Sequence, residues 1–399
     1  MRKINEVGVE GKTIIVRVDL NCPVEKGKIT AHKRIDAHAG TIRNLSARGA
    51  KVVVLSHQGR KGRDDFIGLE QHSKILEQIL NKEIKYVDEV VGPKSEAAIK
   101  EMKNGDIVLL DNVRHLTCET CSPEGKGELV ERIGSLADYY VLDALSVAHR
   151  KHSSVIGFSE KIPCFAGQIL ADELDAVDII RHGHDVVFVL GGSKIDDSFS
   201  IMKKWLSDNH HAKEVLVGGA LGILLLYASE KSIADSLEYL KQKDLLEKLP
   251  EAKKILEQYD GRIVLPMDVA VSVDSKRVET DADNITRGRI MDIGEKTMYD
   301  FVRRIMNAKY VVMNGPLGVY EDPSFSAGTW RVLDAMSRTK AFTLLGGGHT
   351  IAAIQKLGID AERFNYVSLS GKALISYLCG DKLPGLAALE DNMKKFPYV

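Results

Sequence analysis

Residues 186–194 read VVFVLGGSK, an unbroken apolar run from Val186 to Leu190 followed at once by a glycine pair. A short run that is apolar at every position is typical of a strand whose two faces are both buried, as in a parallel sheet covered by helices. The glycines allow a tight turn, and they let backbone amides approach a ligand where open α/β sheets bind theirs. The segment therefore predicts a parallel α/β sheet with a ligand site at its carboxyl edge.

The same alternation of apolar runs and helical stretches continues along the whole chain. Apolar residues recur at three- and four-residue spacing in stretches such as Leu69–Leu80 and Tyr299–Met306, which predicts helices. Strands that alternate with helices predict an α/β fold of parallel sheets with helices on both faces. The expected strands are Thr13–Val18, Lys51–Leu55, Ile107–Leu110 and Tyr139–Leu142 in the first half, and Val186–Leu190, Glu214–Val217, Arg262–Leu265, Tyr310–Met313 and Phe342–Leu345 in the second.

The length of the chain indicates more than one domain, because 399 residues exceed one core of about 100–200 residues. The stretch DELDAVDIIRHG (172–183) predicts a stiff helical joint between two sheets, and GDKLPG (380–385) predicts a turn before a short tail. The expected division is a first domain at residues 1–165, a joining helix at 166–182, a second domain at 183–380 and a tail at 381–399.

Composition and charge indicate a soluble globular protein. The chain is 44% hydrophobic and 28% charged with a formal net charge of −1, which argues against an electrostatic hold on nucleic acid or on an anionic membrane. Its longest apolar run, Val215–Ala228, has 14 residues, whereas a membrane span needs about 20, so we expect a buried strand that leads into a packed helix. The first residues lack the apolar stretch of a signal peptide, and we expect a cytoplasmic protein.

Five cysteines are scattered along the chain, an odd number that does not suggest a disulfide framework. Cys118 and Cys121 form a C-x-x-C pair with no second pair at zinc-finger spacing. Coincidence explains this pair better than a metal or redox role, so we expect no metal site made by the protein alone.

In the first half, polar and basic side chains gather where the expected strands end. Arg17, Asp19 and Asn21 alternate in VRVDLN and would share one face if the strand continued, either as a buried Arg–Asp brace or as part of a ligand site. Guanidinium groups bind carboxylate and phosphate in a bidentate manner, so several at one sheet edge predict a site for a small anion that carries both groups. The other basic residues are His57, Arg60, Arg114 and Arg150, at or after the ends of strands, and Arg34, which precedes a helical stretch.

In the second half, the strands end in glycine instead. Gly191-Gly192 and Gly218-Gly219 each follow a strand, and GGGHT (346–350) follows a third strand and opens a helix. Glycine lets backbone amides approach an anion, and a helix amino terminus favours negative charge, so these loops predict a phosphate site. The chain has neither G-x-x-x-x-G-K-[ST] nor G-x-G-x-x-G, which excludes a P-loop enzyme and disfavours a dinucleotide site.

A series of short motifs, read together, resembles the signatures of the phosphoglycerate kinase family in that family's order. The motifs are VRVDLNCP, the arginine of KRID, SHQGR, LDNVRH, DALSVAHRKHSS, GGSKIDD, LPMD, MDIG, NGPLGVYED, FSAGT and GGGHT, and the resemblance extends from Arg17 to about Gly385. It implies two Rossmann-like domains that close on each other by a hinge. It also implies reversible phosphoryl transfer between 1,3-bisphosphoglycerate with ADP and 3-phosphoglycerate with ATP.

The resemblance implies roles for individual residues as well. Arg34 would act catalytically at the substrate, and Lys194 would reach the transferring phosphate. The residues implied to bind 3-phosphoglycerate are Asp19, Asn21, Arg34, His57, Gln58, Gly59, Arg60, Arg114 and Arg150. Those implied to bind the nucleotide are Gly191, Gly192, Lys194, Gly218, Gly219, Pro316, Val319, Glu321 (on the ribose), Gly347, Gly348, His349 and Thr350.

Three positions depart from the family's main pattern and resemble its archaeal branch. His349 stands where an aspartate that holds magnesium through the nucleotide is usual, Ser198 replaces a second lysine, and Lys372 replaces a glycine in SLSGKA (368–373). We expect Mg²⁺ to accompany ATP or ADP and to be held mainly through the nucleotide. We expect Lys372 to supply the charge of the missing lysine as a catalytic residue; the alternative is an exposed lysine in a surface turn.

The implied chemistry needs no general base, because the attacking diphosphate or carboxylate oxygen is already ionised at neutral pH. Two alternatives remain: a nicotinamide dehydrogenase, which the missing dinucleotide fingerprint disfavours, and a catalytically silent phosphoglycerate- or nucleotide-binding paralogue. We expect a monomer with small-molecule substrates and no nucleic-acid or membrane partner.

Overall fold

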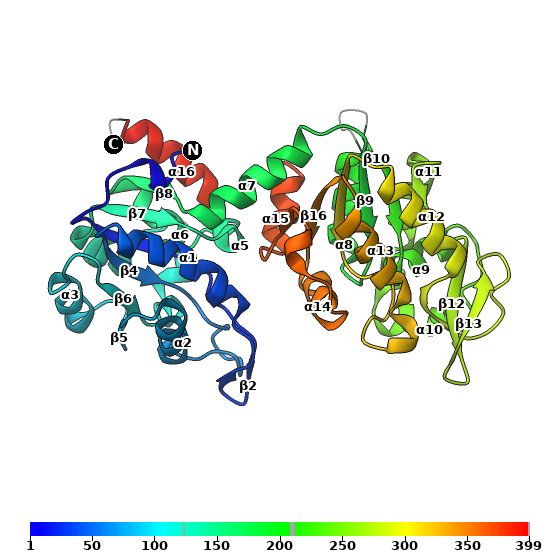
Figure 1. The fold of residues 1–399 in the computed structure, drawn as a ribbon, viewed down its shortest axis with the longest axis horizontal. Coiled ribbons are helices and arrows are strands. Elements are labelled where there is room, and N and C mark those ends of the chain that lie inside the picture. Colours follow the sequence, from blue (N-terminus) through cyan, green and yellow to red (C-terminus); the bar gives the residue numbers. More distant parts are fainter. Residues whose placement is uncertain (123, 208–211, 398–399) are drawn as a thin grey trace. The chain divides into compact units, whose positions relative to one another are not determined.

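The computed structural model describes residues 1–122, 124–207 and 212–397. The chain forms two compact units, Met1–Asp175 with Asp381–Val399, and Ala176–Gly380. Each unit contains one six-stranded sheet, and the chain passes from the first unit to the second within helix α7 (Gln168–Arg181) (Figure 1).

The first unit has a sheet in the order β5-β6-β4-β1-β7-β8, in which every neighbouring pair is parallel. Its strands are β1 (Thr13–Arg17), β4 (Lys51–Leu55), β5 (Lys85–Val87), β6 (Ile107–Leu110), β7 (Tyr139–Leu142) and β8 (Cys164–Ala166), and β2 (Val24–Glu25) and β3 (Lys28–Ile29) form a separate hairpin. Its helices are α1 (Lys33–Ala47), α2 (Glu70–Leu80), α3 (Pro93–Lys100), α4 (Cys118–Cys121), α5 (Leu145–Ala148), α6 (Ser153–Ile156) and α16 (Pro384–Lys395). Shorter helical turns are η1 (Ile4–Glu6), η2 (Val113–His115), η3 (Leu129–Ile133), η4 (Gly134–Leu136) and η5 (Gly157–Glu160).

Parallel pairing brings the ends of three strands in this unit to one edge. Arg17, the last residue of β1, pairs with Leu55 of β4 and with Leu142 of β7. The strand order reverses between β1 and β7, which is where open α/β sheets bind their ligands. The loops that follow these three residues therefore start beside one another.

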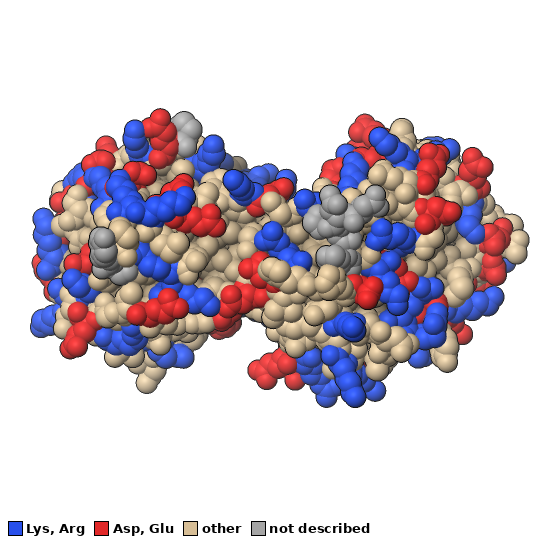
Figure 2. All heavy atoms as spheres, turned by 90° about the horizontal axis from the view of Figure 1, so that it is seen from above, with Lys and Arg blue, Asp and Glu red and all other residues tan. Residues whose placement is uncertain are grey.

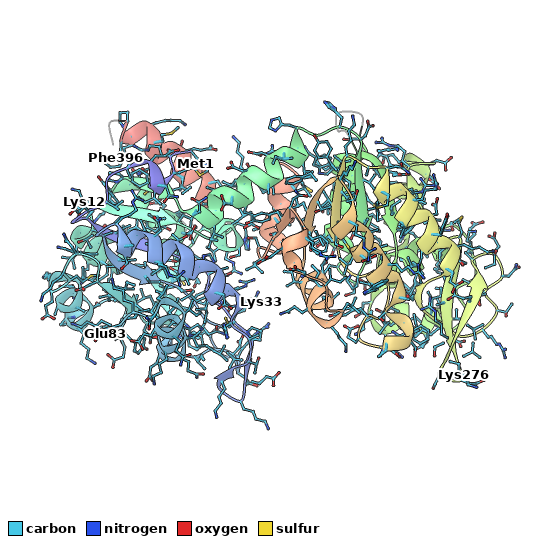
Figure 3. All side chains as sticks on the ribbon, viewed as in Figure 1. Met1, Lys12, Lys33, Glu83, Lys276 and Phe396 are labelled. Carbon is cyan, nitrogen blue, oxygen red and sulfur yellow. The ribbon has the colours of Figure 1, made fainter. Side chains whose placement is uncertain are left out.

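Helix α16 packs in the first unit, beside the amino terminus. Arg2 Nη1 donates a hydrogen bond to the carbonyl of Phe396 at 2.6 Å, and the N–H of Cys164 in β8 donates to Asn392 Oδ1 at 2.7 Å. Figure 3 shows Met1 and Phe396 on the same side of this unit. Residues 381–399, which the sequence suggested as a tail after the second domain, thus contain a helix that belongs to the first unit.

The second unit has a parallel sheet in the order β11-β10-β9-β15-β16-β17. Its strands are β9 (Val186–Leu190), β10 (Ala212–Val217), β11 (Ile263–Val264), β15 (Tyr310–Asn314), β16 (Phe342–Gly346) and β17 (Tyr366–Val367). A smaller antiparallel sheet contains β12 (Asp268–Val273), β13 (Lys276–Asp281) and β14 (Arg289–Ile293). The helices are α8 (Ile195–Trp205), α9 (Gly219–Ala228), α10 (Ser236–Gln242), α11 (Leu249–Gln258), α12 (Glu295–Met306), α13 (Ala327–Arg338), α14 (Gly348–Lys356) and α15 (Lys372–Leu378), with short turns η6 (Leu245–Lys248), η7 (Pro323–Phe325) and η8 (Ala361–Arg363).

The apolar run of β9 is buried on both faces, as its sequence predicts. Phe188 belongs to a core that also contains Phe199 of α8 and Leu224 of α9. Its neighbour Val189 points to the opposite face and belongs to a second core with Phe301 of α12. Helices therefore cover both sides of this sheet, and the expected α/β fold class is confirmed.

Glycines let two loops meet at the point where the strand order of the second sheet reverses, between β9 and β15. A Cβ added to Gly191 would lie 2.1 Å from the carbonyl oxygen of Pro316, and one added to Gly315 would lie 2.3 Å from the carbonyl oxygen of Gly191. Gly315 also has a φ of +93°, which favours glycine. The N–H of Gly192 donates to the carbonyl of Pro316 at 2.8 Å, so the loops contact backbone to backbone with no side chain between them.

Most of the expected strands are confirmed. Four match residue for residue: Lys51–Leu55, Ile107–Leu110, Tyr139–Leu142 and Val186–Leu190. The expectation that Val215–Ala228 is a strand leading into a helix is also confirmed, by β10 and α9.

Two details of the expected strand ends are wrong. β1 ends at Arg17, so Asp19 and Asn21 lie in the following loop and do not share a strand face with Arg17. Arg114 does not end a strand either, because β6 stops at Leu110 and Arg114 lies in the turn η2. The short strands β5 and β8 and the antiparallel sheet of β12, β13 and β14 were not expected from the sequence.

We expect Gly191→Ala to lower the free energy of unfolding by roughly 1–3 kcal/mol, because its Cβ would overlap the backbone of Pro316. Denaturant unfolding followed by circular dichroism measures the change. Gly348→Ala is the control, since no atom lies within 4 Å of the added Cβ, and it should change stability by less than about 0.5 kcal/mol. Equal losses in both variants would show that the close approach of the loops is not what requires glycine.

Candidate functional site

Asp19 organises the loop edge of the first sheet. It is buried, its Oδ2 accepts a hydrogen bond from Ser146 Oγ at 2.5 Å, and the same carboxylate forms an ion pair with Arg34. Its Oδ1 accepts from the N–H of Asn21 at 3.1 Å. A carboxylate bonded in this way holds Arg34, in the first turn of α1, beside the loop that follows β1.

Arg17 and His57 form the buried floor of this edge. Arg17 is only 1% exposed; its Nε donates to Ser154 Oγ at 2.9 Å, and its Nη2 lies 3.1 Å from His57 Nδ1. Burial and the charge of Arg17 hold the pKa of His57 well below its usual value, so the imidazole is neutral. Arg17 is thus buried as a brace would be, but it is hydrogen-bonded to Ser154 and His57 rather than to Asp19.

Further guanidinium groups lie close enough to repel one another. Burial, followed by the charges of Arg150, Arg17 and Arg60, lowers the pKa of Arg114 to about 10. Burial lowers the pKa of Arg34 and of Arg150 as well. Because arginine stays charged in proteins, these shifts report crowded positive charge, which favours an anion with more than one negative group.

A pocket lies among three of these arginines. It is lined by Arg60, Lys61, Arg114, Leu116, Thr117, Thr120, Cys121, His149, Arg150 and His152. The sequence did not mark Lys61, His149 or His152 as site residues; each follows an expected arginine or precedes it by one or two positions. The lining combines basic groups with hydroxyls, which suits a phosphate or a carboxylate.

Gln58 and Gly59 shape the loop after β4. Gln58 is completely buried; its Nε2 donates to the carbonyl of Cys22 at 2.9 Å, and its Oε1 accepts from the N–H of Cys22 at 2.8 Å. Gly59 has a φ of +63°, and an added Cβ would lie 2.2 Å from the carbonyl oxygen of Asp65. The carbonyl of Gly59 accepts a hydrogen bond from Arg114, and its N–H donates to Asn21 Oδ1 at 2.8 Å. The polar atoms of Gln58 and Gly59 therefore bond to protein, and the carbonyl of Gly59 helps to hold Arg114 in position.

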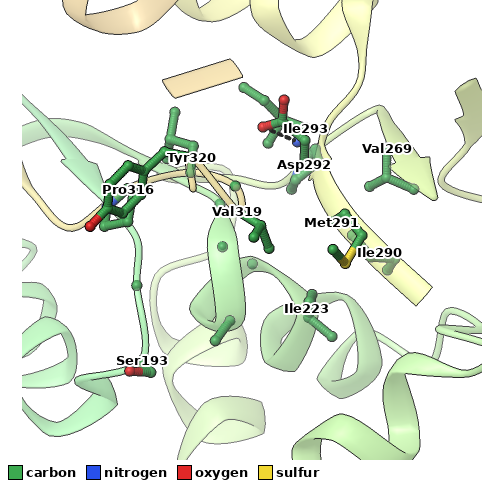
Figure 4. Close-up of a pocket in the computed structure, with 18 of the residues that line it drawn as sticks. Ser193, Ile223, Val269, Ile290, Met291, Asp292, Ile293, Pro316, Val319 and Tyr320 are labelled. Atoms are coloured by element: carbon green, nitrogen blue, oxygen red, sulfur yellow. Dashed lines mark hydrogen bonds between the residues drawn. The ribbon is translucent and has the colours of Figure 1, made fainter. Parts of the chain in front are cut away.

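The second unit has a pocket at the loops after β9, β10 and β15 (Figure 4). Seven expected nucleotide residues line it: Gly192, Gly218, Gly219, Pro316, Val319, Glu321 and His349. Among the described residues, the lining does not include the other five, which are Gly191, Lys194, Gly347, Gly348 and Thr350. Gly191 and Lys194 lie in the loop after β9, and Gly347, Gly348 and Thr350 lie after β16 at the start of α14.

Much of the lining was not expected from the sequence. Figure 4 shows the pocket between α9, which carries Ile223, and β14, which carries Met291. The guanidinium carbon of Arg289 lies 4.3 Å from the centre of the Tyr239 ring, and both residues line the pocket. The apolar walls and the aromatic ring suit a flat base, whereas the glycine loops suit phosphates.

Asp292 lies buried in the wall of this pocket. Its Oδ2 accepts from the N–H of Gly328 at 2.8 Å and from Arg277 Nη1 at 3.0 Å. Burial raises the pKa of this carboxyl to about 6, although both bonds oppose the shift. The carboxylate joins β14, β13 and the start of α13, and so holds the small sheet against the pocket.

The remaining expected residues lie in the loops before α8 and α14 or in the first turns of α14 and α15. Thr350 Oγ1 accepts from the N–H of Gly315 at 2.8 Å and so ties α14 to the loop after β15. Lys194 precedes α8 and Lys372 is the first residue of α15; both are exposed, and the two helices pack together. Ser198 in α8 is completely buried, so a lysine at this position would have to displace packed groups.

Other features of the described chain bear on its ligands. Residues 1–122, 124–207 and 212–397 contain no group of three or more His, Cys, Asp and Glu side chains placed to hold a metal ion. None of the helices in these ranges is both long and apolar enough to span a bilayer. On the face shown in Figure 2, acidic and basic side chains are interspersed over both units, so the arginine cluster is a local feature.

Comparison with known proteins places the chain in one family. The family model described as phosphoglycerate kinase matches residues 4–381. Among curated proteins, phosphoglycerate kinase from Methanothermobacter thermautotrophicus is 38% identical over 400 residues, covering 98% of this chain and 97% of that protein. The corresponding protein of Pyrococcus horikoshii is 34% identical over 414 residues, covering 100% of both chains.

Solved structures agree with these matches. The crystal structure of phosphoglycerate kinase from Pyrococcus horikoshii OT3 superposes with a TM-score of 0.92, covering 99% of this chain and 100% of that one at 34% identity. The structure of the protein from Coxiella burnetii gives a TM-score of 0.83 at 29% identity, covering 98% of each chain. The similarity to archaeal proteins at 34–38% identity confirms the expected archaeal-type branch.

Proposed function

The chain belongs to the phosphoglycerate kinase family, and we propose that its two units divide the substrates between them. The protein is a phosphotransferase that moves a phosphoryl group reversibly between 1,3-bisphosphoglycerate with ADP and 3-phosphoglycerate with ATP. The alternatives of a dehydrogenase and of a silent paralogue have no support among the relatives. In our proposal, residues 1–165 bind 3-phosphoglycerate and residues 183–380 bind the nucleotide. The observation that carries it is the contrast between charged side chains at one sheet edge and bare glycine backbone at the other.

The phosphoglycerate site follows from the charge of the substrate. 3-Phosphoglycerate carries a carboxylate and a phosphate, and the guanidinium forks of the first unit match both groups. We assign direct contacts to Arg34, Arg60, Arg114, Arg150 and the neutral ring of His57. The remaining residues, Asp19, Asn21, Gln58 and Gly59, act by holding these groups in place, since their polar atoms bond to protein.

The nucleotide site follows from the pocket of the second unit. We assign the base to the apolar wall beside Val319 and Pro316, and the ribose to Glu321. The phosphates would lie at the glycine loops, where Gly191, Gly192, Gly218, Gly219, Gly347, Gly348 and Thr350 surround the amino termini of helices α8, α9 and α14.

Phosphoryl transfer between these sites needs positive charge and exclusion of water rather than a base. Negative charge spreads over the three equatorial oxygens of the transferring group, and we assign its neutralisation to Lys194, just before α8, and to Lys372, the first residue of α15. We propose that closure about α7 brings the two ligands together, as the chemistry requires.

Magnesium would be held mainly by the nucleotide. Mg²⁺ prefers oxygen ligands, and the described residues offer no carboxylate cluster for it, while His349 is an exposed imidazole beside the glycine loop. When bound with the nucleotide, the ion neutralises phosphate charge. We further propose a cytoplasmic monomer that has no nucleic-acid or membrane partner.

We expect Arg34→Ala to weaken binding of 3-phosphoglycerate by roughly 1.5–3 kcal/mol, because a charge-assisted pair is lost. Nucleotide affinity should hardly change, since Arg34 belongs to the other unit. Isothermal titration with each ligand measures both effects, and Arg43→Ala, on the same helix but exposed, is the matched control. Equal losses for the two ligands would contradict the division of substrates.

We expect a crystal of the magnesium–ADP complex to show only phosphate and water oxygens around the ion, at roughly 2.1 Å, because imidazole is a poor ligand for Mg²⁺. His349→Asp supplies a carboxylate and should lower the magnesium concentration needed for half-maximal activity. A nitrogen of His349 in the coordination sphere would refute the proposed role of the nucleotide.

We expect Lys372→Ala to reduce kcat by roughly 10²–10³, because the transferring phosphate loses one stabilising cation. Binding of either substrate should change little, and Lys372→Arg should keep part of the rate. Lys340→Ala removes another exposed lysine of the same unit and serves as the control for steady-state kinetics. An unchanged kcat in Lys372→Ala would show that Lys372 is an exposed surface lysine with no catalytic role.

A further inference from the structure

The C-x-x-C segment has a buried charge between its cysteines. Cys118–Cys121 form the single turn α4, in which Cys121 is exposed but Glu119 has an exposed fraction of 0%. A carboxylate inside a protein needs hydrogen bonds and nearby positive charge to remain there. The hydrogen-bond partners of Glu119 therefore indicate the structural role of this segment.

Glu119 is bonded to α6 through both of its oxygens. Oε2 accepts from the N–H of Ser154 at 2.9 Å, and Oε1 accepts from Ser154 Oγ at 2.6 Å. His152 Nδ1 lies 3.4 Å from the same Oε1. Since Ser154 Oγ donates its proton to Glu119, its lone pairs are free to accept the hydrogen bond from Arg17 Nε at 2.9 Å.

The chain of hydrogen bonds continues from Arg17 to His57. Arg17 Nη2 lies 3.1 Å from His57 Nδ1, and a guanidinium group has no acceptor atom. Nδ1 must therefore accept, which places the ring proton of neutral His57 on Nε2. Burial and the charges of Arg17 and Arg114 lower the pKa of His57, so that this neutral form persists at neutral pH.

We propose that Glu119 is a positioning residue that orients Arg17 through Ser154 and thereby fixes His57 as the Nε2–H tautomer, a donor to an anionic oxygen of phosphoglycerate. This inference rests on the proposed phosphoglycerate site. The groups that face His57 are Arg17, Asp19, Arg34, Arg114 and Arg150, so Glu119 acts on a ring that is surrounded mainly by cations.

If Glu119 acted only through its negative charge, it would weaken phosphoglycerate binding instead of supporting it. Its negative charge acts on Arg17, Arg114 and Arg150, and it lowers the attraction of this cluster for an anion. If Glu119 served only as a countercharge, its neutralisation would tighten phosphoglycerate binding. If it positions Arg17, neutralisation weakens binding, because Ser154 bonds to both carboxylate oxygens and glutamine has an NH2 donor in place of one of them.

The test measures the tautomer of His57 by the ¹⁵N chemical shifts of its ring nitrogens, assigned with His57→Gln. In the wild type without ligand we expect a protonated Nε2 and an unprotonated Nδ1. In Glu119→Gln we expect a mixture of the two tautomers and an affinity for 3-phosphoglycerate about tenfold lower. Nucleotide affinity should stay unchanged, and Glu124→Gln, an exposed residue near the same segment, should behave as the wild type.

Ser154→Ala provides a second variant, since it breaks the link to Arg17 and leaves the charge of Glu119 in place. It should give the same mixture of tautomers. A protonated Nδ1 in the wild type would overturn the inference without any variant, and so would an unchanged tautomer or tighter binding in Glu119→Gln. A changed tautomer with unchanged phosphoglycerate affinity would remove His57 from the substrate site, which is a failure of the proposed function and not of the hydrogen-bond chain.

Discussion

Parallel pairing of the central strands is the constraint on which each unit depends. Because the register sets Arg17 beside Leu55 and Leu142, three loops of the first unit start next to one another at the same edge of the sheet. In the second unit, Leu190 pairs with Asn314, so the glycine loops after β9 and β15 start next to each other at one edge of the sheet. Because these sheets are buried on both faces, a shift of one residue would misplace two cores at once, so the position of the loops is fixed by packing.

In our proposal, the two edges bind anions by different physical means. The first collects guanidinium groups whose mutual repulsion is countered by buried carboxylates, Asp19 at the loop edge and Glu119 behind Arg17. In the second, glycine lets the loops approach each other backbone to backbone at helix amino termini, where we propose that the phosphates bind. Fixed carboxylates and a neutral imidazole leave the first edge ordered but still positive, whereas the second has an apolar wall beside its glycine loops.

Sequence predicted best what depends on local pattern. The strand Val186–Leu190 is apolar at every position and its bounds were correct, and residue type alone marked the arginines and the glycine loops. The residues that sequence could not place depend on distant partners. Glu119 is buried because Ser154 lies beside it, and Arg17 meets Ser154 across 137 positions of the chain.

Other features gave too weak a local signal. The antiparallel sheet that carries Met291 to the proposed nucleotide pocket includes the polar strand Lys276–Asp281, which has neither an apolar run nor a helix beside it in sequence. Gln58 illustrates the converse. The family resemblance implies a ligand contact for Gln58, but both polar atoms of its side chain bond to Cys22 and so stabilise the loop.

Amide hydrogen exchange with 3-phosphoglycerate alone tests most directly whether the arginine edge takes up the substrate's charge. We predict slower exchange in the loops at residues 18–21, 57–60 and 112–116 of the first unit. The glycine loops at residues 191–193 and 346–348 should exchange at the same rate as in the free protein. Protection of the glycine loops, with no change in the first unit, would contradict the assignment of phosphoglycerate to the arginine cluster.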